Sequence, residues 1–420
     1  MAKKTEDGSR KASKQNTRID KGGCLLCHKN GGGEGGCWYA AASKQESLGL
    51  LVVSFSGLPT PSSEETLSSW LFRCSINPNA AGFPRLSSTE RPAYWWEGVE
   101  IKYSDPDSEF LSASQRLSCV AGDITPELLR NFFCLRGDKL VEWRYRRFFC
   151  PDCLRDDVAN GRLPIWRKDW CYIYSCVCAA HDRELVRLVD TPRYSRAWDA
   201  FVQSCNSISN NASIEETLFF RFCSSTFTKI EHALISRDNQ QPTLHDLFYR
   251  LFNIFLQCPF RGSRGGIARI HLQTRKDARA PDASSFEQSI LLGASTADPS
   301  SRFGSLVLTA SLLEIIPYSR FLIFTKLCEK RRGGMLIPRD LHKAAIFPYI
   351  NRAGYETLYR FLGGFPRKDF PLLDRHLQLQ EHSYVQDGVL GKRLFGYSQW
   401  AIKCACLSLP AGCKEKNSTC

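Results

Sequence analysis

The chain has 420 residues, which is too long for one hydrophobic core and predicts two or three domains. Its hydrophobic content of 43% and aromatic content of 12% are those of a folded protein and exclude a wholly disordered chain. A formal net charge of +13 favours a polyanionic partner, of which nucleic acid is the usual one.

The sequence also argues against a membrane protein and a secreted one. Charged residues and a proline interrupt the longest apolar stretch, 306–328, which we interpret as a pair of buried helices rather than a membrane span. Nineteen cysteines behind a polar, lysine-containing start favour a reducing, cytoplasmic location over a disulfide-linked secreted protein. The sequence contains no phosphate loop, no H-E-x-x-H and no G-x-S-x-G motif, so we expect a protein that is not an enzyme.

Residues 1–56 are rich in Lys, Ser, Asn and Gly, a composition that predicts a disordered leader. The first folded element is expected soon after Gly57. Apolar residues between Leu67 and Cys74 recur at intervals of three and four, which predicts an amphipathic helix with Ser62 or Ser63 as its N-cap.

Residues 112–135 have the rhythm of a helix-turn-helix. Gly122 suits the turn, while Thr125 and Pro126 suit the N-cap and first position of the second helix. Such units read DNA in many regulators, and Arg130 is the basic residue of the second helix that could contact it. A plain helical hairpin fits the same pattern equally well.

A zinc knuckle is predicted within residues 144–190. Its ligands would be Cys150, Cys153, Cys178 and His181, in the order C-x2-C and C-x2-H. Three thiolates and one imidazole suit one tetrahedral Zn²⁺ per chain. Because protein fills all four positions, the metal is expected to be structural rather than catalytic.

Basic residues surround this motif and are candidates for DNA contact. They are Arg144, Arg146, Arg147, Arg167 and Lys168. The alternative is an ordinary solvated surface, because several aspartates lie between them.

Residues 191–403 are predicted to form a helical C-terminal domain, with a basic polar loop at 259–299. A second helix-turn-helix could lie near 338–365, from Asp340 to Phe347 and from Arg352 to Leu362. Arg352 and Arg360 would be its candidate DNA contacts. Residues 404–420 are expected to be a frayed tail. The predicted fold is therefore mainly α and multidomain, with the helix-turn-helix region and zinc knuckle before the helical domain.

The zinc motif and its surroundings resemble the TniQ family of transposition proteins. The resemblance covers about residues 57–190 and has three parts, in the order found in the family. They are the Leu-Ser-Ser-Trp-Leu helix at 67–71, the helix-turn-helix stretch, and a signature around the metal ligands. That signature is Cys-Pro-x-Cys-Leu at 150–154, a basic residue two positions before Trp170, Cys-x-x-His after seven intervening residues, and a leucine, Leu185, soon after.

The resemblance implies a non-catalytic accessory role in bacterial DNA transposition. Proteins of this family recognise a target DNA site, or a guide-RNA effector complex bound there, and recruit an AAA+ ATPase regulator that activates the transposase. On this reading the four ligands bind structural zinc. Two alternatives stay open: a zinc-containing helix-turn-helix transcriptional regulator, and a zinc hydrolase, which would need an open metal position.

Overall fold

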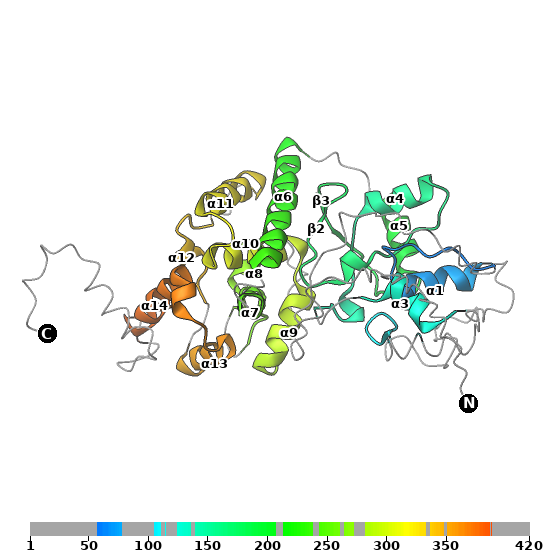
Figure 1. Cartoon of the computed structure of the whole chain (residues 1–420). Coiled ribbons are helices and arrows are strands. Elements are labelled where there is room, and N and C mark those ends of the chain that lie inside the picture. The colour runs from blue at the N-terminus through cyan, green and yellow to red at the C-terminus, as the bar shows by residue number, and fades with distance from the viewer. Residues whose placement is uncertain are drawn as a thin grey trace, which may run out of the picture.

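The computed structural model describes residues 57–77, 105–110, 114, 124–135, 139–206, 213–237, 243–260, 264–272, 282–332, 337–347, 351–386 and 388. Helices dominate this part of the chain, and its four strands have two residues each, so the prediction of a mainly α protein is confirmed. The helices gather in two lobes, with α1 to α5 in one and α6 to α14 in the other (Figure 1). The predicted leader, 1–56, and the predicted tail, 404–420, lie outside the described residues. None of the described helices has the length and apolar character needed to cross a membrane.

Helix α1 (Leu67–Ile76) forms where the apolar spacing predicts it, but its N-cap is Thr66 rather than Ser62 or Ser63. The Thr66 hydroxyl accepts a hydrogen bond from the backbone N–H of Ser69 at 3.3 Å. The preceding residues turn before the helix starts, because the N–H of Glu65 bonds to the carbonyl of Ser62. Glu65 is then buried and forms an ion pair with Arg73.

Helix α3 (Pro126–Phe133) packs directly on α1. The predicted N-cap is confirmed, because Thr125 Oγ1 accepts from the N–H of Leu128 at 3.2 Å and Pro126 is the first helical residue. Phe133 is fully buried and its ring lies 5.2 Å from that of Trp70. Apart from Ser114, the predicted first helix of this unit lies outside the described residues, so the helix-turn-helix stays a prediction.

The rest of the first lobe is a compact module of short elements. They are η3 (Trp143–Tyr145), β1 (Phe148–Phe149), α4 (Pro151–Ala159), η4 (Lys168–Cys171), β2 (Val177–Cys178), β3 (Arg183–Glu184), β4 (Val186–Arg187) and α5 (Arg196–Asn206). Strands β1 and β4 pair antiparallel, and so do β2 and β3. Sheet this short cannot supply a core, so the module packs around aromatic rings instead. The indoles of Trp166 and Trp170 meet edge to face at 5.3 Å.

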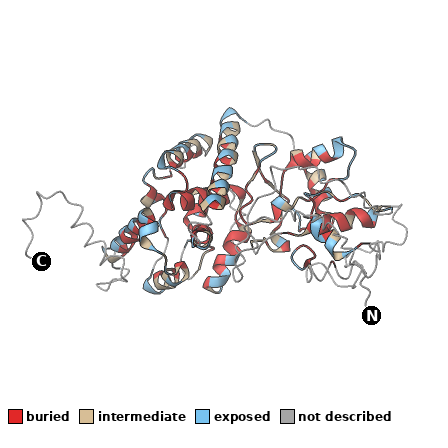
Figure 2. Cartoon of the chain, in the orientation of Figure 1, coloured by how far each residue is buried: buried red, intermediate tan, exposed pale blue. Residues whose placement is uncertain are grey.

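The second lobe is a helical assembly. Its elements are α6 (Ile214–Arg237), α7 (Leu244–Leu256), α8 (Ile267–Leu272), α9 (Phe286–Thr296), α10 (Pro299–Leu312), α11 (Tyr318–Arg332), α12 (Leu341–Ala344), α13 (Arg352–Leu362), η6 (Arg367–Asp369) and α14 (Pro371–Gln386). Helix α10 is buried along its whole length and packs against α7, α8 and α11 (Figure 2). Because α10 is rich in serine and glycine, its neighbours approach closely. Ser305 Oγ, for example, donates to the carbonyl of Phe252 at 2.7 Å.

Two features of this lobe correct the sequence prediction. The basic stretch 259–299 is not simply a loop, because it contains α8 and α9. Its Arg269 is buried and donates to the carbonyls of Leu256 and Gly293, both at 2.7 Å. The predicted pair of buried helices in 306–328 forms as the end of α10 and most of α11, but only α10 is buried throughout, because α11 exposes Ile323 and Lys326.

The unit at 338–365 contains two helices, although the first is shorter than predicted. Helix α12 is only one turn, capped by Asp340, whose carboxylate accepts from the N–H of Lys343. Helix α13 has the predicted bounds and ends at Gly363, whose φ of 70° lies in the left-handed region that glycine favours.

Arg302 of α10 connects the two lobes. Its side chain is fully buried, and its guanidinium donates to the carbonyls of Tyr172, Ser175 and Ser295 at 3.2 to 3.3 Å. Burial lowers the pKa of Arg302 to about 10, which leaves the side chain charged at neutral pH. A second connection is the ion pair between Arg331 of α11 and Glu184 of β3 at 2.7 Å.

Candidate metal centre

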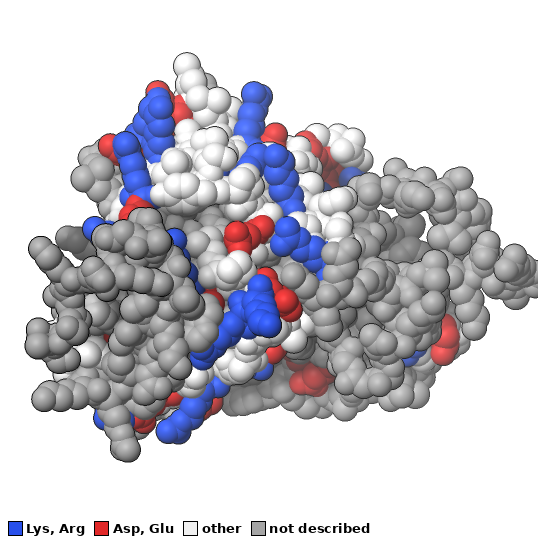
Figure 3. Space-filling view, turned by 60° about the vertical axis from the view of Figure 1, so that its left-hand side comes forward, with Lys and Arg blue, Asp and Glu red and all other residues white. Residues whose placement is uncertain are grey.

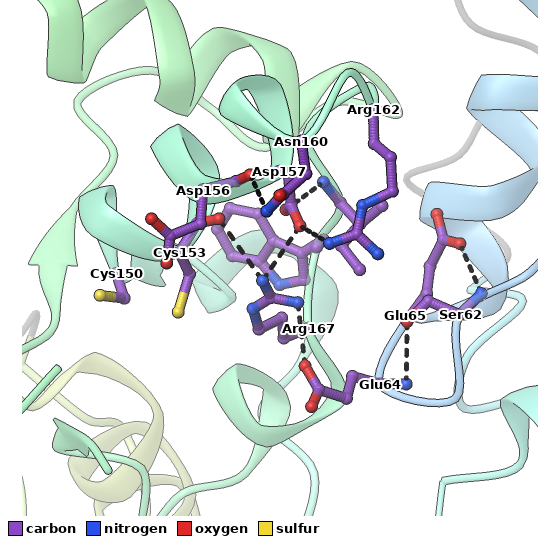
Figure 4. A network of polar contacts seen from close by, with 12 residues as sticks. Ser62, Glu64, Glu65, Cys150, Cys153, Asp156, Asp157, Asn160, Arg162 and Arg167 are labelled. Atoms are coloured by element: carbon purple, nitrogen blue, oxygen red, sulfur yellow. Dashed lines mark hydrogen bonds and ion pairs between the residues drawn. The ribbon is translucent and has the colours of Figure 1, made fainter. Parts of the chain in front are cut away.

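The first two predicted ligands lie at the N-terminus of α4. Cys150 is the N-cap residue, Pro151 occupies the first helical position, and Cys153 lies in the first turn (Figure 4). Proline fits there because the first helical N–H has no partner inside the helix. The sequence Cys-Pro-x-Cys thus brings two sulfurs together at the N-terminus of a helix.

The other two predicted ligands lie on the β2–β3 hairpin. Cys178 ends β2, and His181 lies in the turn before β3. Asp182 completes this turn with a φ of 44°, a left-handed conformation that aspartate tolerates better than most residues. The pairing of β1 with β4 then holds the residues before Cys150 against those after the hairpin, with Phe149 opposite Val186.

These elements bring all four side chains together. The ligand atoms of Cys150, Cys153, Cys178 and His181 lie within 4.8 Å of one another, in a group that could hold a metal ion. His181 Nδ1 lies 3.6 Å from the sulfur of Cys150, 3.3 Å from that of Cys153 and 3.6 Å from that of Cys178. The sulfurs of Cys153 and Cys178 are 3.5 Å apart.

These separations fit the edges of a tetrahedron around a zinc-sized ion. Bonds of about 2.3 Å to sulfur and 2.0 Å to nitrogen give edges of about 3.8 Å between sulfurs and about 3.6 Å from sulfur to nitrogen. The four separations given above lie within about 0.3 Å of those values. The side chains therefore have the spacing of a four-coordinate site before any ion is considered.

The charge balance of the cluster also favours a cation. The pKa of the Cys178 thiol is lowered to about 3, first by its hydrogen bond with Cys150 and then by that with Cys153. The N–H groups of His181 and Ala180 also donate to the Cys178 sulfur. The pKa of Cys150 is raised, first by its hydrogen bonds with Cys153 and Cys178. Three adjacent sulfurs cannot all be charged without a counter-charge, so one keeps its proton unless a cation replaces it.

One further residue orients the imidazole, and the sequence analysis missed it. Asp156 Oδ2 lies 2.9 Å from His181 Nε2, on the side of the ring opposite the sulfurs. A carboxylate in this position fixes the tautomer that leaves Nδ1 free to bind a metal. The spacing in the sequence could have indicated this residue. Asp156 follows Cys153 by three residues, which places both on one face of α4.

The neighbouring thiols do not join the cluster. Cys171 and Cys176 are buried nearby, and either could have replaced Cys178 as the third sulfur ligand. The group that could hold a metal contains Cys178 instead. Cys171 donates to the carbonyl of Arg167 at 3.7 Å, which confirms that it points elsewhere.

Three of the basic residues proposed for DNA contact turn inward. Arg146 is 1% exposed and forms ion pairs with Asp105 and Asp107. Arg167 lies between Asp157, at 3.1 Å, and Glu64, at 3.0 Å (Figure 4). The ammonium group of Lys168, which is half-buried, donates to the carbonyl of Phe132. These side chains join segments of the fold, which gives them a structural role, and their contact with DNA stays a prediction.

The remaining candidates are more accessible, although most have partners of their own. Arg130 is exposed. Arg144 pairs with Glu142, and the half-buried Arg147 donates to the carbonyl of Arg144. Arg352 and Arg360 are exposed on α13, and both lie near the single carboxylate of Glu356, at 2.9 and 3.7 Å.

The buried arginines belong to a polar network that sequence reasoning did not find. Asp107 is fully buried and accepts hydrogen bonds from Ser68, Arg146 and Arg196. The guanidinium of Arg196 also lies 4.1 Å from the ring centre of Trp143. The network joins α1, the 105–110 segment, η3 and α5. Its members are up to 128 residues apart in the sequence, as with Ser68 and Arg196, so no local sequence pattern predicts the network.

Searches for similar proteins returned no match, whether the chain was compared with family models, with curated proteins or with solved structures.

Proposed function

We propose that this chain is a zinc-stabilised, non-catalytic accessory protein of DNA transposition, similar in role to the TniQ proteins. It would recognise a target DNA site, or a complex bound there, and recruit an AAA+ ATPase regulator. The observation that carries the proposal is the convergence of Cys150, Cys153, Cys178 and His181, whose ligand atoms lie within 4.8 Å of one another.

Zinc is the metal that this donor set favours. Three thiolates and an imidazole are soft and borderline ligands, which disfavours magnesium and calcium. Four protein ligands leave no position for substrate or activated water, so the metal would be structural. This supports a binding protein over the alternative of a zinc hydrolase.

The signature residues are buried together, which supports the view that the residues carrying the family resemblance form one packed structural unit. Leu154, Trp170 and Leu185 belong to the same hydrophobic cluster as the cysteine ligands. A signature that combines metal ligands with their packing partners is harder to reach by chance than an isolated pair of C-x2-C and C-x2-H motifs. The alternative of a free-standing transcriptional regulator shares the metal but requires no ATPase.

The test is recruitment of an AAA+ ATPase to DNA. We would identify the genes beside the one that encodes this chain, purify any neighbouring AAA+ ATPase, and measure its assembly on duplex DNA with and without the full chain. We expect the chain to increase assembly at least tenfold. The variant Cys150→Ser with Cys153→Ser serves as the metal-free comparison and should lose the increase.

Two results would count against the proposal. If the chain bound a specific promoter tightly and left the ATPase unaffected, the regulator would replace it. If metal analysis of the purified chain gave no zinc, with the fold unchanged in the double variant, the structural zinc would be wrong.

A further inference from the structure

Five exposed basic residues on α6, α11 and α12 have no ion-pair partner among the residues that the structure describes. They are Arg221 and Lys229 on α6, Lys326 and Lys330 on α11, and Lys343 on α12. We call them the α6–α11 face. An unpaired cation in water keeps its full attraction for an external anion, whereas a paired cation has part of its charge neutralised.

The helices that carry this face lie side by side. Arg320, near the start of α11, donates to Thr226 of α6 at 2.6 Å. Arg331, near the end of α11, lies over the ring of Phe219 at 4.6 Å, close to the start of α6. The two helices therefore run antiparallel along their length.

The segment before α12 covers the other side of α11. The hydroxyl of Tyr318 donates to the carbonyl of Arg339 at 2.6 Å, and Arg339 lies 3.7 Å from the carboxylate of Glu329. Lys343 follows four residues after Arg339. Helix α6, helix α11 and the segment before α12, which together lead to or carry these basic residues, are therefore neighbours within the lobe.

Lys326 and Lys330 form the centre of this surface. They are four residues apart on α11 and therefore project from the same side of the helix. In Figure 3, blue side chains extend over the upper part of this lobe, the level at which Figure 1 shows α6 and α11, and red side chains are fewer there.

Helix α13 has a weaker claim to an anionic partner. Its two exposed arginines, Arg352 and Arg360, share the carboxylate of Glu356, so the three side chains together carry one net positive charge. The sequence marked α13 because it looked like the second helix of a DNA-reading unit. The basic residues without ion-pair partners instead make α11 the better candidate for contact with an anionic partner.

We propose that the α6–α11 face binds the phosphate backbone of duplex DNA. The inference rests on the proposed function for DNA as the partner and adds where the duplex would lie. Lysines without base-reading partners suit contact with phosphates, which positions a protein without selecting sequence.

Duplex DNA fits this face better than a single strand does. Proteins that bind single strands stack bases on exposed aromatic rings. The large apolar side chains exposed on α11 are Tyr318 and Ile323. Tyr318 already stacks on Phe321 at 5.8 Å and uses its hydroxyl on Arg339, which leaves it poorly placed to hold a base.

The experiment compares two variants of the full chain with equal loss of charge. Lys326→Gln with Lys330→Gln removes the centre of the face, and glutamine keeps the helix propensity of lysine. Arg264→Gln with Lys368→Gln removes two exposed cations outside the face. Affinity for a random-sequence duplex is measured between 50 and 300 mM salt, conditions chosen from the usual range of phosphate-driven binding.

We expect the α11 variant to lower the slope of log affinity against log salt by about 1.8, since each lost phosphate contact contributes about 0.9. If the two proteins extrapolate to the same affinity at 1 M salt, this change in slope lowers the affinity at 0.1 M salt roughly 60-fold. The control variant should stay within about twofold of the unmodified chain.

Several results would overturn the inference. Equal weakening of both variants would show that net charge, not this face, drives binding. Unchanged duplex binding in the α11 variant would reject the face while leaving DNA as the partner. If the chain recruited the ATPase but preferred single-stranded DNA, only the choice of duplex DNA as the ligand would be wrong. If the chain bound no nucleic acid, the DNA part of the proposed function would be wrong as well.

Discussion

His376 of α14 is the buried residue whose protonation the fold resists most clearly. It is fully buried, and its Nδ1 lies 3.2 Å from Nδ1 of His342, with the two rings stacked. Burial, followed by the charge of His342, lowers the pKa of His376 to about 3. Asp340 acts in the opposite direction, and burial and Arg375 lower the pKa of His342 as well.

The low pKa of His376 predicts a loss of stability in mild acid. Between about pH 6.5 and pH 3, the unfolded chain binds a proton at this residue that the folded chain does not, so stability falls as pH falls. From pH 7 to pH 5 this one group should lower the free energy of unfolding by about 2 kcal/mol. Urea unfolding of the unmodified chain and of His376→Gln at both pH values measures the difference.

Glutamine cannot take up a proton in this range, so His376→Gln should lose less stability on acidification than the unmodified chain. Buried carboxylic acids with raised pKa values, such as Asp157, act in the opposite sense in both proteins and cancel in the comparison. An equal pH dependence in the two proteins would mean that His376 is protonated in the folded state.

At the scale of elements, close helix contacts set the shape of the second lobe. An added Cβ at Gly293 of α9 would lie 2.6 Å from the carbonyl oxygen of Leu256 and 2.8 Å from the Cα of Gln257. Both atoms belong to the backbone at the end of α7, so neither can rotate away. This contact explains why α9 has a glycine at this position.

Gly293→Ala should therefore destabilise the protein, although alanine favours helices. The overlap is expected to cost about 1–3 kcal/mol, against a gain of about 1 kcal/mol in helix propensity. Gly364→Ala is the matched control, because an added Cβ there meets no atom within 4 Å. Thermal unfolding should show a lower midpoint for the first variant and little change for the second. Equal midpoints would mean that α7 and α9 separate easily.

The sequence predicted elements where the evidence was local. The Thr125 cap and the bounds of α13 each depend on residues within a few positions of one another, and the candidate metal ligands form two pairs, Cys150 with Cys153 and Cys178 with His181, that are each three positions apart. The ion pairs of Arg146 and Arg167 could not be predicted, because their carboxylate partners, Asp105 and Glu64, lie 41 and 103 residues away. Composition cannot distinguish a surface arginine from a buried one when its partner is that distant.

The same limit explains the stretch at 259–299. Its glycines and arginines have the composition of a loop, yet Gly266 lies so close to α7 that an added Cβ would meet the carbonyl oxygen of Phe255 at 2.2 Å. Arg269 binds carbonyl groups instead of solvent. Both residue types serve packing here, and only the three-dimensional contacts reveal it.

For the whole molecule, the β2–β3 hairpin relates the metal centre to the second lobe. Cys178 and His181 lie at one end of the hairpin. Glu184, which also belongs to the hairpin, forms an ion pair with Arg331 of α11. Ser300 of α10 also donates to Glu184. Losing the metal would free the hairpin and weaken these contacts together.

Removal of metal should therefore destabilise the whole chain. We expect a strong zinc chelator to lower the midpoint of thermal unfolding by roughly 10 °C or more, since structural zinc contributes a large share of folding free energy. Cys153→Ser with Cys178→Ser should start from the lower midpoint and not respond to the chelator. A protein that loses all its metal while its midpoint stays constant would contradict this expectation.

The hydrogen bonds of Arg302 limit which substitutions this protein can accept during evolution. Its guanidinium meets Tyr172, Ser175 and Ser295 only through their backbone carbonyls, which every amino acid provides. Those three positions can accept other side chains without losing the hydrogen bonds to Arg302. Arg302 itself cannot be replaced in this way. Lysine, the other long basic residue, lacks the forked N–H donors of a guanidinium that reach separate carbonyls. Related chains should thus retain the arginine while the residues around it drift.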